Sequence, residues 1–406
     1  MRDFKDVYHG TRCLFHHCDP YNQSELIRFY QTEPGESGSD SIQRRQAETL
    51  YVNLPPTFLL VAPFAILPLG LASAIWMLLT AASIILAAVL TLDLGADYAP
   101  IISGGLIALL LANSAVVLAN GNPAGIVIGL CVIAVWSFLK ERFVLAGILC
   151  LSVSLAMKPH DAGLIWLFFL FAGRVYRKRA LQTLAVTLVL ALAATLWVSR
   201  VAPNWMPELR SNLAEISAHG GNNDPGPAGL TSKSRTPEVI TDLQAAVSVF
   251  RDDPRLYDSV SYVVCGTLLL VWSIAAFQSR PSPTLTCFAL AAVAPLAMLV
   301  IYHRAYDAKL LLLTVPASAI LWAEGGRIAR VALLVCMATL VFTGEIPLAI
   351  LFSLTKKLHP DNTSVFGKIE TVALMRLAPM FLLVMSIVYL WIYVRRTHAE
   401  STATEP

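Results

Sequence analysis

The sequence is poor in charged residues. Only 14% of its 406 residues are Asp, Glu, Lys or Arg, whereas 56% are hydrophobic; an ordinary soluble domain has roughly a quarter charged. A water-soluble core cannot absorb that much apolar sequence. The few charges nearly balance, with a net charge of +3 and a pI of about 8.4. The sequence therefore lacks the basic excess of a nucleic-acid binder, and we expect no nucleic-acid partner.

The first 53 residues lack the apolar stretch of a cleavable signal peptide. We therefore expect either that an internal span directs membrane insertion or that an N-terminal helix lies upstream of this start.

Cysteines in polar surroundings are also scarce. Most of the seven lie in apolar runs, where a thiol behaves as a small hydrophobic group: Cys131, Cys150, Cys265, Cys287 and Cys336. Cys13 and Cys18 flank His16 and His17, but this spacing fits no standard zinc pattern, and we expect no metal. A disulfide between them requires an oxidising compartment.

The apolar residues are concentrated in runs that approach the roughly 20 residues needed to cross a bilayer. These runs predict an all-α polytopic membrane protein with about eleven crossings. Six precede a long polar loop, at 73–92, 100–118, 123–139, 143–157, 161–173 and 181–198. Five follow it, at 259–277, 285–301, 309–322, 328–342 and 374–394. The proline-rich run 55–69 suits a shallow or re-entrant segment better than a straight span.

Short-loop Lys and Arg residues predict the orientation, because they favour the cytoplasmic side. All the basic clusters between the predicted spans fall on one side of the membrane: Lys140 with Arg142, Arg174 to Arg179, Arg280, Arg327 with Arg330, and Arg395 with Arg396. The predicted organisation is an outer loop, a first bundle, a long outer loop, a second bundle and a cytoplasmic tail, at 1–54, 55–200, 201–258, 259–396 and 397–406. The long loop is predicted to form a cover with a helical stretch near 239–250.

Ionisable residues beside the spans gather on the predicted outer face. Lys158 and His160 interrupt an apolar run, where a charge usually pairs or lines a wet cavity. Lys158 suits an anionic lipid head, either as a functional group or as an ordinary interfacial lysine. In the N-terminal segment Asp3 and Asp19 are carboxylates suited to general-base chemistry, or simply members of a solvated loop.

His303, Arg304, Asp307 and Lys309 form the densest ionisable group beside the spans. Arg grips a phosphate with parallel hydrogen bonds, and Lys adds a point charge. An Arg304 to Asp307 ion pair and an ordinary hydrogen-bonding role for His303 are the alternative interpretations.

Polar side chains also separate two predicted spans at Asn120, Gly121 and Asn122, immediately before Pro123. Such amides either bind sugar hydroxyls or cap the helix that begins at the proline.

Several short motifs, in this order, resemble those of polyprenol-phosphate-mannose-dependent glycosyltransferases of the GT-C fold, closest to glycosyltransferase family 87. The motifs are Asp3-Phe4 with Tyr8, Asp19-Pro20-Tyr21, Tyr51-Val52-Asn53-Leu54-Pro55-Pro56, Pro63, Trp76, Asn120-Gly121-Asn122 and Lys158-Pro159. Two features depart from the family pattern. Its members have a membrane helix before the Asp-Phe motif, and a Gly-Gln-containing motif is common where this chain has Asn120-Gly121-Asn122.

The resemblance implies a GT-C-like bundle and an inverting, metal-independent transfer of a hexose, usually mannose, from a polyprenyl-phosphate donor to a lipid or glycan acceptor. It implies that Asp3 is the catalytic base. We expect the donor phosphate to be bound by Lys158, Arg304 and Lys309. The expected supporting or acceptor-binding residues are Asp19, Tyr21, Tyr51, Asn120, Asn122, His160, His303 and Asp307.

The alternative function is a polytopic transporter or lipid flippase. Transporters usually carry paired broken helices and a polar path through both leaflets, whereas the ionisable residues here gather on one predicted face. The sequence therefore favours a cell-membrane enzyme whose site faces the outer side.

Overall fold

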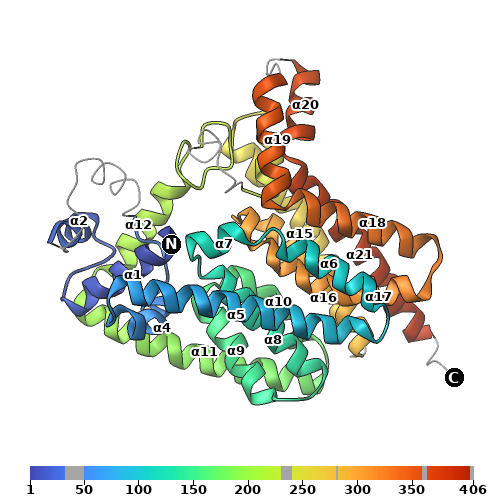
Figure 1. Ribbon diagram of the computed structural model, residues 1–406, viewed down its shortest axis with the longest axis horizontal. Coiled ribbons are helices and arrows are strands. Elements are labelled where there is room, and N and C mark those ends of the chain that lie inside the picture. Colours follow the sequence, from blue (N-terminus) through green and yellow to red (C-terminus); the bar gives the residue numbers. More distant parts are fainter. Residues whose placement is uncertain (33–49, 230–239, 280–281, 359–363, 403–406) are drawn as a thin grey trace.

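The computed structural model describes residues 1–32, 50–229, 240–279, 282–358 and 364–402 (Figure 1). Within these segments the regular elements are helices, and the one isolated bridge joins Ile240 to Arg304. The prediction of an all-α polytopic membrane protein is confirmed.

Six stretches of helix in the described residues are long and apolar enough to cross a membrane. They are α5 (Leu69–Ala96), α11 (Arg174–Val201), α15 (Pro254–Gln278), α16 (Pro283–Val300), the 3₁₀ helix η1 (Ala305–Thr314) continued by α17 (Val315–Glu324), and α21 (Leu377–Thr402). A seventh is counted if α18 (Gly326–Phe342) and α19 (Glu345–Leu358), bent by 69°, form one broken span. The number eleven stays a prediction.

Shorter apolar helices pack among the long ones, and all but the first of them coincide with predicted crossings. They are α4 (Pro55–Ala65), α6 (Pro100–Leu111), α8 (Ala124–Leu139), α9 (Val144–Met157) and α10 (Pro159–Phe171). The predicted shallow segment corresponds to α4, whose 11 residues fall short of the roughly 20 needed for a span.

The N-terminal segment is more ordered than the polar loop expected from the sequence. It forms α1 (Arg2–Phe15) and α2 (Gln23–Thr32). Apolar side chains at helical spacing, including Phe4, Val7, Tyr8 and Leu14, give α1 one buried face. Polar residues between them hid this pattern from a search for long apolar runs.

Helices α5 and α8 cross at close range in the first bundle. A Cβ added at Gly129 would lie 2.8 Å from the Ser83 backbone oxygen, so the two backbones can approach this closely only at a glycine. A Cβ added at Gly125 of α8 would lie 2.6 Å from the Thr80 side-chain methyl of α5. This contact fixes the N-terminal end of α8, where the polar residues of the candidate site lie.

The predicted cover at 201–258 contains α12 (Trp205–Ser217) and the short α14 (Leu243–Val247). The predicted helical stretch is therefore present as α14, while residues 230–239 lie outside the described residues. Between them the buried Asp224 accepts hydrogen bonds from the backbone N–H of Gly220 and Gly226 and from the Tyr257 hydroxyl. The carboxylate thereby attaches this loop to α15.

Two further helices complete the fold. The short α7 (Ala115–Asn120) lies beside the N-terminus, and α20 (Val365–Met375) runs beside α19 in a hairpin that projects from the body (Figure 1).

Candidate functional site

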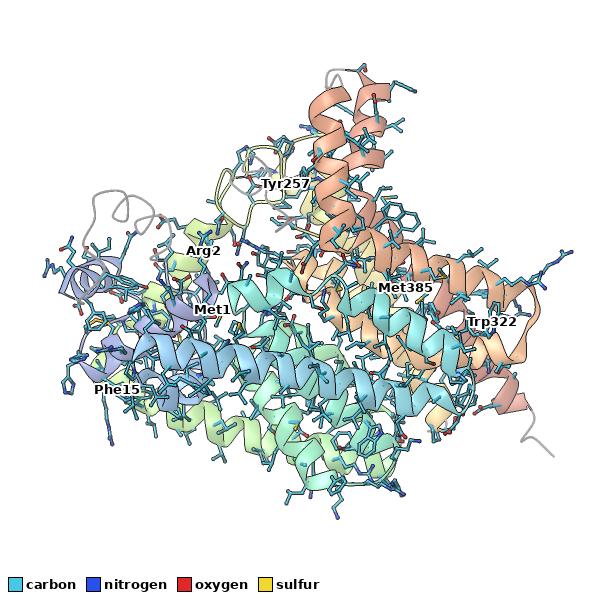
Figure 2. The ribbon with its side chains drawn as sticks, in the orientation of Figure 1. Met1, Arg2, Phe15, Tyr257, Trp322 and Met385 are labelled. Carbon is cyan, nitrogen blue, oxygen red and sulfur yellow. A yellow bond between two sulfur atoms is a disulfide. The ribbon has the colours of Figure 1, made fainter. Side chains whose placement is uncertain are left out.

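The first turn of α1 packs over the break between α7 and α8. Phe4 is fully buried and stacks on Trp76 with ring centroids 4.8 Å apart. The Trp76 indole donates to the carbonyl of Gly121, 2.9 Å away. Gly121 has a left-handed φ of 65°, and a Cβ there would lie 3.0 Å from the Phe4 Cβ. The glycine therefore lets α1 approach, and Figure 2 shows Met1 and Phe15 at opposite ends of that helix.

Asn122 joins the N-terminal helix to the second bundle. Its Oδ1 accepts from the Ala124 backbone N–H at 2.9 Å, which is the predicted capping role. Its Nδ2 donates to Asp3 Oδ2 at 2.6 Å and to the Tyr306 hydroxyl at 3.0 Å. Asn122 is therefore both a cap and the link that positions the Asp3 carboxylate.

Lys158 lies in the sharp turn between α9 and α10. Because Pro159 cannot continue α9, the chain turns at an extended Lys158 and restarts as α10. The Lys158 ammonium lies 3.2 Å from Asp161 Oδ2 and 3.2 Å from Asp307 Oδ1. Burial lowers the pKa of Lys158, but the two carboxylates outweigh it and raise that pKa above its ordinary value. Lys158 is therefore a permanent cation.

Asp307 lies in the first turn of η1 and pairs with Lys158, which lies between α9 and α10. Its Oδ2 accepts from the Arg304 backbone N–H at 2.9 Å, which closes the first turn of η1. The Arg304 guanidinium lies over the Tyr302 ring, 5.4 Å from its centroid, and donates to the Tyr302 hydroxyl. The backbone of Arg304 pairs with Ile240 of the cover, so this segment is held from both sides.

His303 is buried, and both of its ring nitrogens face oxygen acceptors. Nδ1 lies 2.9 Å from the Ile301 carbonyl, and Nε2 lies 3.0 Å from Asp161 Oδ1. Both acceptors favour a hydrogen on the nitrogen that faces them, so the surroundings of the ring favour its doubly protonated form. Burial lowers the pKa of His303, but the hydrogen bond to Asp161, the charges of Asp161 and Asp307 and the Ile301 carbonyl together outweigh it and leave the pKa raised. His303 thus holds Asp161 in place.

His160 completes a group whose donor atoms could surround a metal ion. His160, Asp161 and His303 each offer an atom within 4.8 Å of the others. However, Lys158 already lies 3.2 Å from Asp161, and His303 donates its Nε2 hydrogen to the same carboxylate. The positive charge that a metal would supply to Asp161 is therefore provided by side chains of the protein.

Two other residues predicted for the site, Lys309 and Asn120, have no described contact to Lys158. Lys309 is 1% exposed, and its ammonium donates to the Asn113 carbonyl at the end of α6. Asn120 is half-buried at the end of α7, two residues before Asn122.

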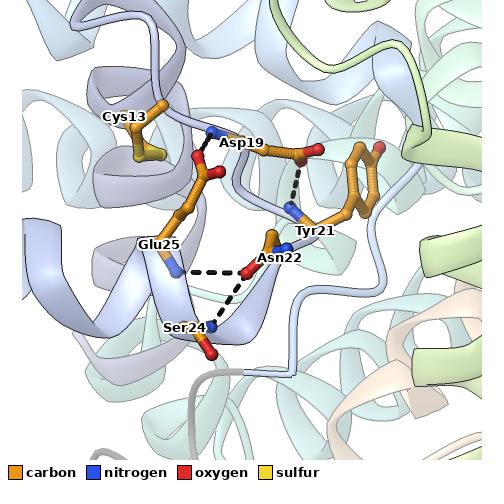
Figure 3. Close-up of a disulfide and its surroundings, with 7 residues drawn as sticks. Cys13, Asp19, Tyr21, Asn22, Ser24 and Glu25 are labelled. Carbon is orange, nitrogen blue, oxygen red and sulfur yellow. Dashed lines mark hydrogen bonds between the residues drawn. A yellow bond between two sulfur atoms is a disulfide. The ribbon is translucent and has the colours of Figure 1, made fainter.

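Asp19, Tyr21 and Tyr51 form a separate cluster at the other end of α1. The roughly ten residues between Asp3 and Cys13 span about 15 Å of helix. The Cys13 to Cys18 disulfide closes the turn after α1, and Asp19 Oδ1 accepts from the Tyr21 N–H at 2.9 Å (Figure 3). Asn212 of α12 donates to the carbonyls of both tyrosines at 3.0 Å.

The electrostatics of this cluster differ from those around Lys158. Burial raises the pKa of Asp19 to about 7, and the nearby carboxylates of Glu208 and Glu25 contribute to the rise. Burial also raises the pKa of Tyr21 and Tyr51. The contacts of the three predicted residues order the N-terminal segment.

Asp161 and Tyr306 are central to the site but were not singled out in the sequence. A carboxylate at the head of an apolar helix was the available signal for Asp161, because charged groups at membrane depth require partners. Tyr306 gave no such signal, since tyrosine is common at membrane interfaces.

Comparison with known proteins identifies the family of this chain. The sequence profile of glycosyltransferase family 87 matches residues 51–302, more than half of the chain. The matched region includes Asn122, Lys158 and Asp161. No curated protein and no solved structure gives a significant match.

Proposed function

The chain belongs to glycosyltransferase family 87, and on that premise we propose that it transfers a hexose, mannose in the first instance, from a polyprenyl phosphate to a lipid or glycan acceptor. The transfer takes place on the outer face of the membrane. One observation carries the proposal: Asn122 donates to both Asp3 and Tyr306, and the residue after Tyr306, Asp307, pairs with Lys158, although these residues come from distant parts of the sequence.

In the proposed reaction Asp3 takes the proton of the acceptor hydroxyl. The hydroxyl oxygen forms a bond to the anomeric carbon as the bond from that carbon to the phosphate oxygen breaks. The electron pair leaves with the polyprenyl phosphate, which departs as an anion. Attack opposite the leaving group inverts the anomeric configuration.

Negative charge develops on the leaving phosphate, and fixed cations stabilise it most when they need no reorganisation. Lys158 suits this role because its side chain is 15% exposed, whereas Lys309 is 1% exposed. The Arg304 guanidinium, held over Tyr302, adds a planar donor. The proposal assigns charge stabilisation to these side chains and involves no metal ion.

The outer-face assignment is supported by two features. The short-loop Lys and Arg residues favour the opposite side, and the Cys13 to Cys18 disulfide suits an oxidising compartment.

The test is transfer of radiolabelled mannose from polyprenyl-phosphate-mannose to a membrane lipid extract, comparing wild type with Asp3→Asn at equal expression. Removing a general base costs roughly 10²–10⁴-fold in rate. Asp6→Asn, one turn further along α1, is the matched control and should keep its activity. If transfer is lost in Asp6→Asn but not in Asp3→Asn, the catalytic base is Asp6 and not Asp3. If no polyprenyl-phosphate hexose is transferred at all, the proposal is refuted.

A further inference from the structure

A cavity of about 470 Å³ lies between α7 and the first half of α19. Its wall is formed by Ile346, Ala349, Ile350 and Leu354 on one face of α19 and by Val116 of α7. Ile346 and Ile350 are more than half exposed. The volume is in the range of sites that hold small molecules. The groove is therefore large and apolar enough for a lipid chain.

The lining of the groove includes one ionisable side chain, Glu345, at the first residue of α19. Glu345 is 7% exposed, and its Oε2 accepts from the Val116 backbone N–H at 2.9 Å. Among the described residues its Oε1 has no hydrogen-bond partner although it is buried. Such an oxygen is costly to leave unpaired, so this end of the groove is suited to a ligand that donates a hydrogen bond.

Neighbouring groups hold Glu345 in this position without using Oε1. Asn113 Oδ1 accepts from the Ile346 backbone N–H at 3.2 Å, and the Asn113 carbonyl accepts from Lys309. A Cβ at Gly344 would lie 2.6 Å from Asn113 Oδ1, so the bend before α19 is closely packed against the end of α6. The carboxylate is therefore fixed at the bend between α18 and α19.

The polar end of the groove is close to the proposed reaction centre. Only the six residues of α7 separate the Glu345 cap from the turn at Asn122, a rise of about 9 Å. Asn122 in turn holds Asp3. A head group bound at Glu345 would therefore be separated from the residue that holds Asp3 by the length of α7.

We propose that this groove binds the chain of the acceptor lipid and that Glu345 Oε1 accepts a hydrogen bond from an uncharged hydroxyl of its head group. The inference rests on the proposed function, because it assigns the acceptor side of the same site. The proposal assigns the acceptor and not the donor to this groove, because the ionisable side chain in its lining is the carboxylate of Glu345, which repels a phosphate. The donor phosphate instead faces Lys158.

The test uses full-length protein in nanodiscs and hexadecyl glucoside with a photoreactive diazirine in its alkyl chain. Labelled peptides are identified by mass spectrometry. We expect labelling of α19 within 346–354, which unlabelled hexadecyl glucoside competes away and hexadecyl phosphate does not. Glu345→Gln should weaken glucoside competition about tenfold, the size of one lost hydrogen bond to a charged group, and should allow the phosphate to compete.

Ala349→Trp, which fills the groove, should abolish the labelling and raise the KM for the acceptor but not for the donor. Ala74→Trp adds the same ring to an exposed position of α5 and should change neither. Labelling that neither compound competes away, or that hexadecyl phosphate competes away better in wild type, overturns the inference. If glucoside binds as expected but no polyprenyl-phosphate sugar is transferred, the proposed function fails while the lipid site stands.

Discussion

The role of Lys158 can be tested by separating its contribution to stability from its contribution to catalysis. Lys158→Met leaves the carboxylates of Asp161 and Asp307, which are 0% and 3% exposed, without their shared ammonium. Breaking a buried ion pair in this way costs about 3–5 kcal/mol. The variant should therefore unfold at a clearly lower temperature in detergent, and its transfer rate should fall about 10²–10³-fold from loss of charge stabilisation.

Adding Asp307→Asn to Lys158→Met removes one of the two carboxylate charges that Lys158→Met leaves without an ammonium. Asp161 keeps its bond from His303, and the new amide oxygen can still accept from the Arg304 N–H. We expect the double variant to regain most of the lost thermal stability but not the transfer rate. The measurements are fluorescence-detected thermal unfolding and initial rates of mannose transfer.

Lys140→Met is the matched control for these variants. Lys140 pairs with Asp93 and Asp97, whose side chains are 51% and 76% exposed. A pair of this kind contributes about 0–1 kcal/mol, so the control should behave as wild type. If the double variant of Lys158 and Asp307 recovered its transfer rate together with its stability, the ammonium would be only structural and its role toward the phosphate would be refuted.

Three further predictions concern other contacts. Tyr306→Phe removes the hydroxyl that accepts from Asn122, so Asp3 is held less firmly. We expect kcat to fall about tenfold at unchanged Tm. Equal rates for the variant and wild type would contradict this. Asp19 has a folded pKa of about 7, above its ordinary 3.8, so its stabilising effect is full in acid and is lost as pH rises through 7. Asp19→Asn should therefore raise the free energy of unfolding at pH 8 by about 1–2 kcal/mol after allowance for solvent, seen as a higher Tm, but should not do so at pH 4. Cys18→Ser opens a short disulfide loop and should cost about 2 kcal/mol in unfolding experiments, whereas wild type should lose the same amount on reduction.

The sequence predicted part of the candidate site, and the roles assigned to its residues stay predictions. Lys158, His160, His303 and Asp307 were expected on one face of the membrane from their position beside spans, and the structure brings these four together. Asp19, Tyr21 and Tyr51 were expected near the same chemistry, but they lie at the far end of α1. Asp19 and Tyr21 follow Asp3 closely in the chain, but helix α1 lies between them and separates its residues by 1.5 Å each.

The amino-acid sequence by itself determined that this chain is a helical membrane protein, because hydropathy and Pro breaks act over one helix at a time. Only the tertiary structure decided which polar residues share a site. Asn122 and Asp3 are 119 residues apart in the chain, and Lys158 and Asp307 are 149 apart. Such contacts depend on how whole helices pack, through close approaches such as that at Gly129, and on the need of buried charges for partners.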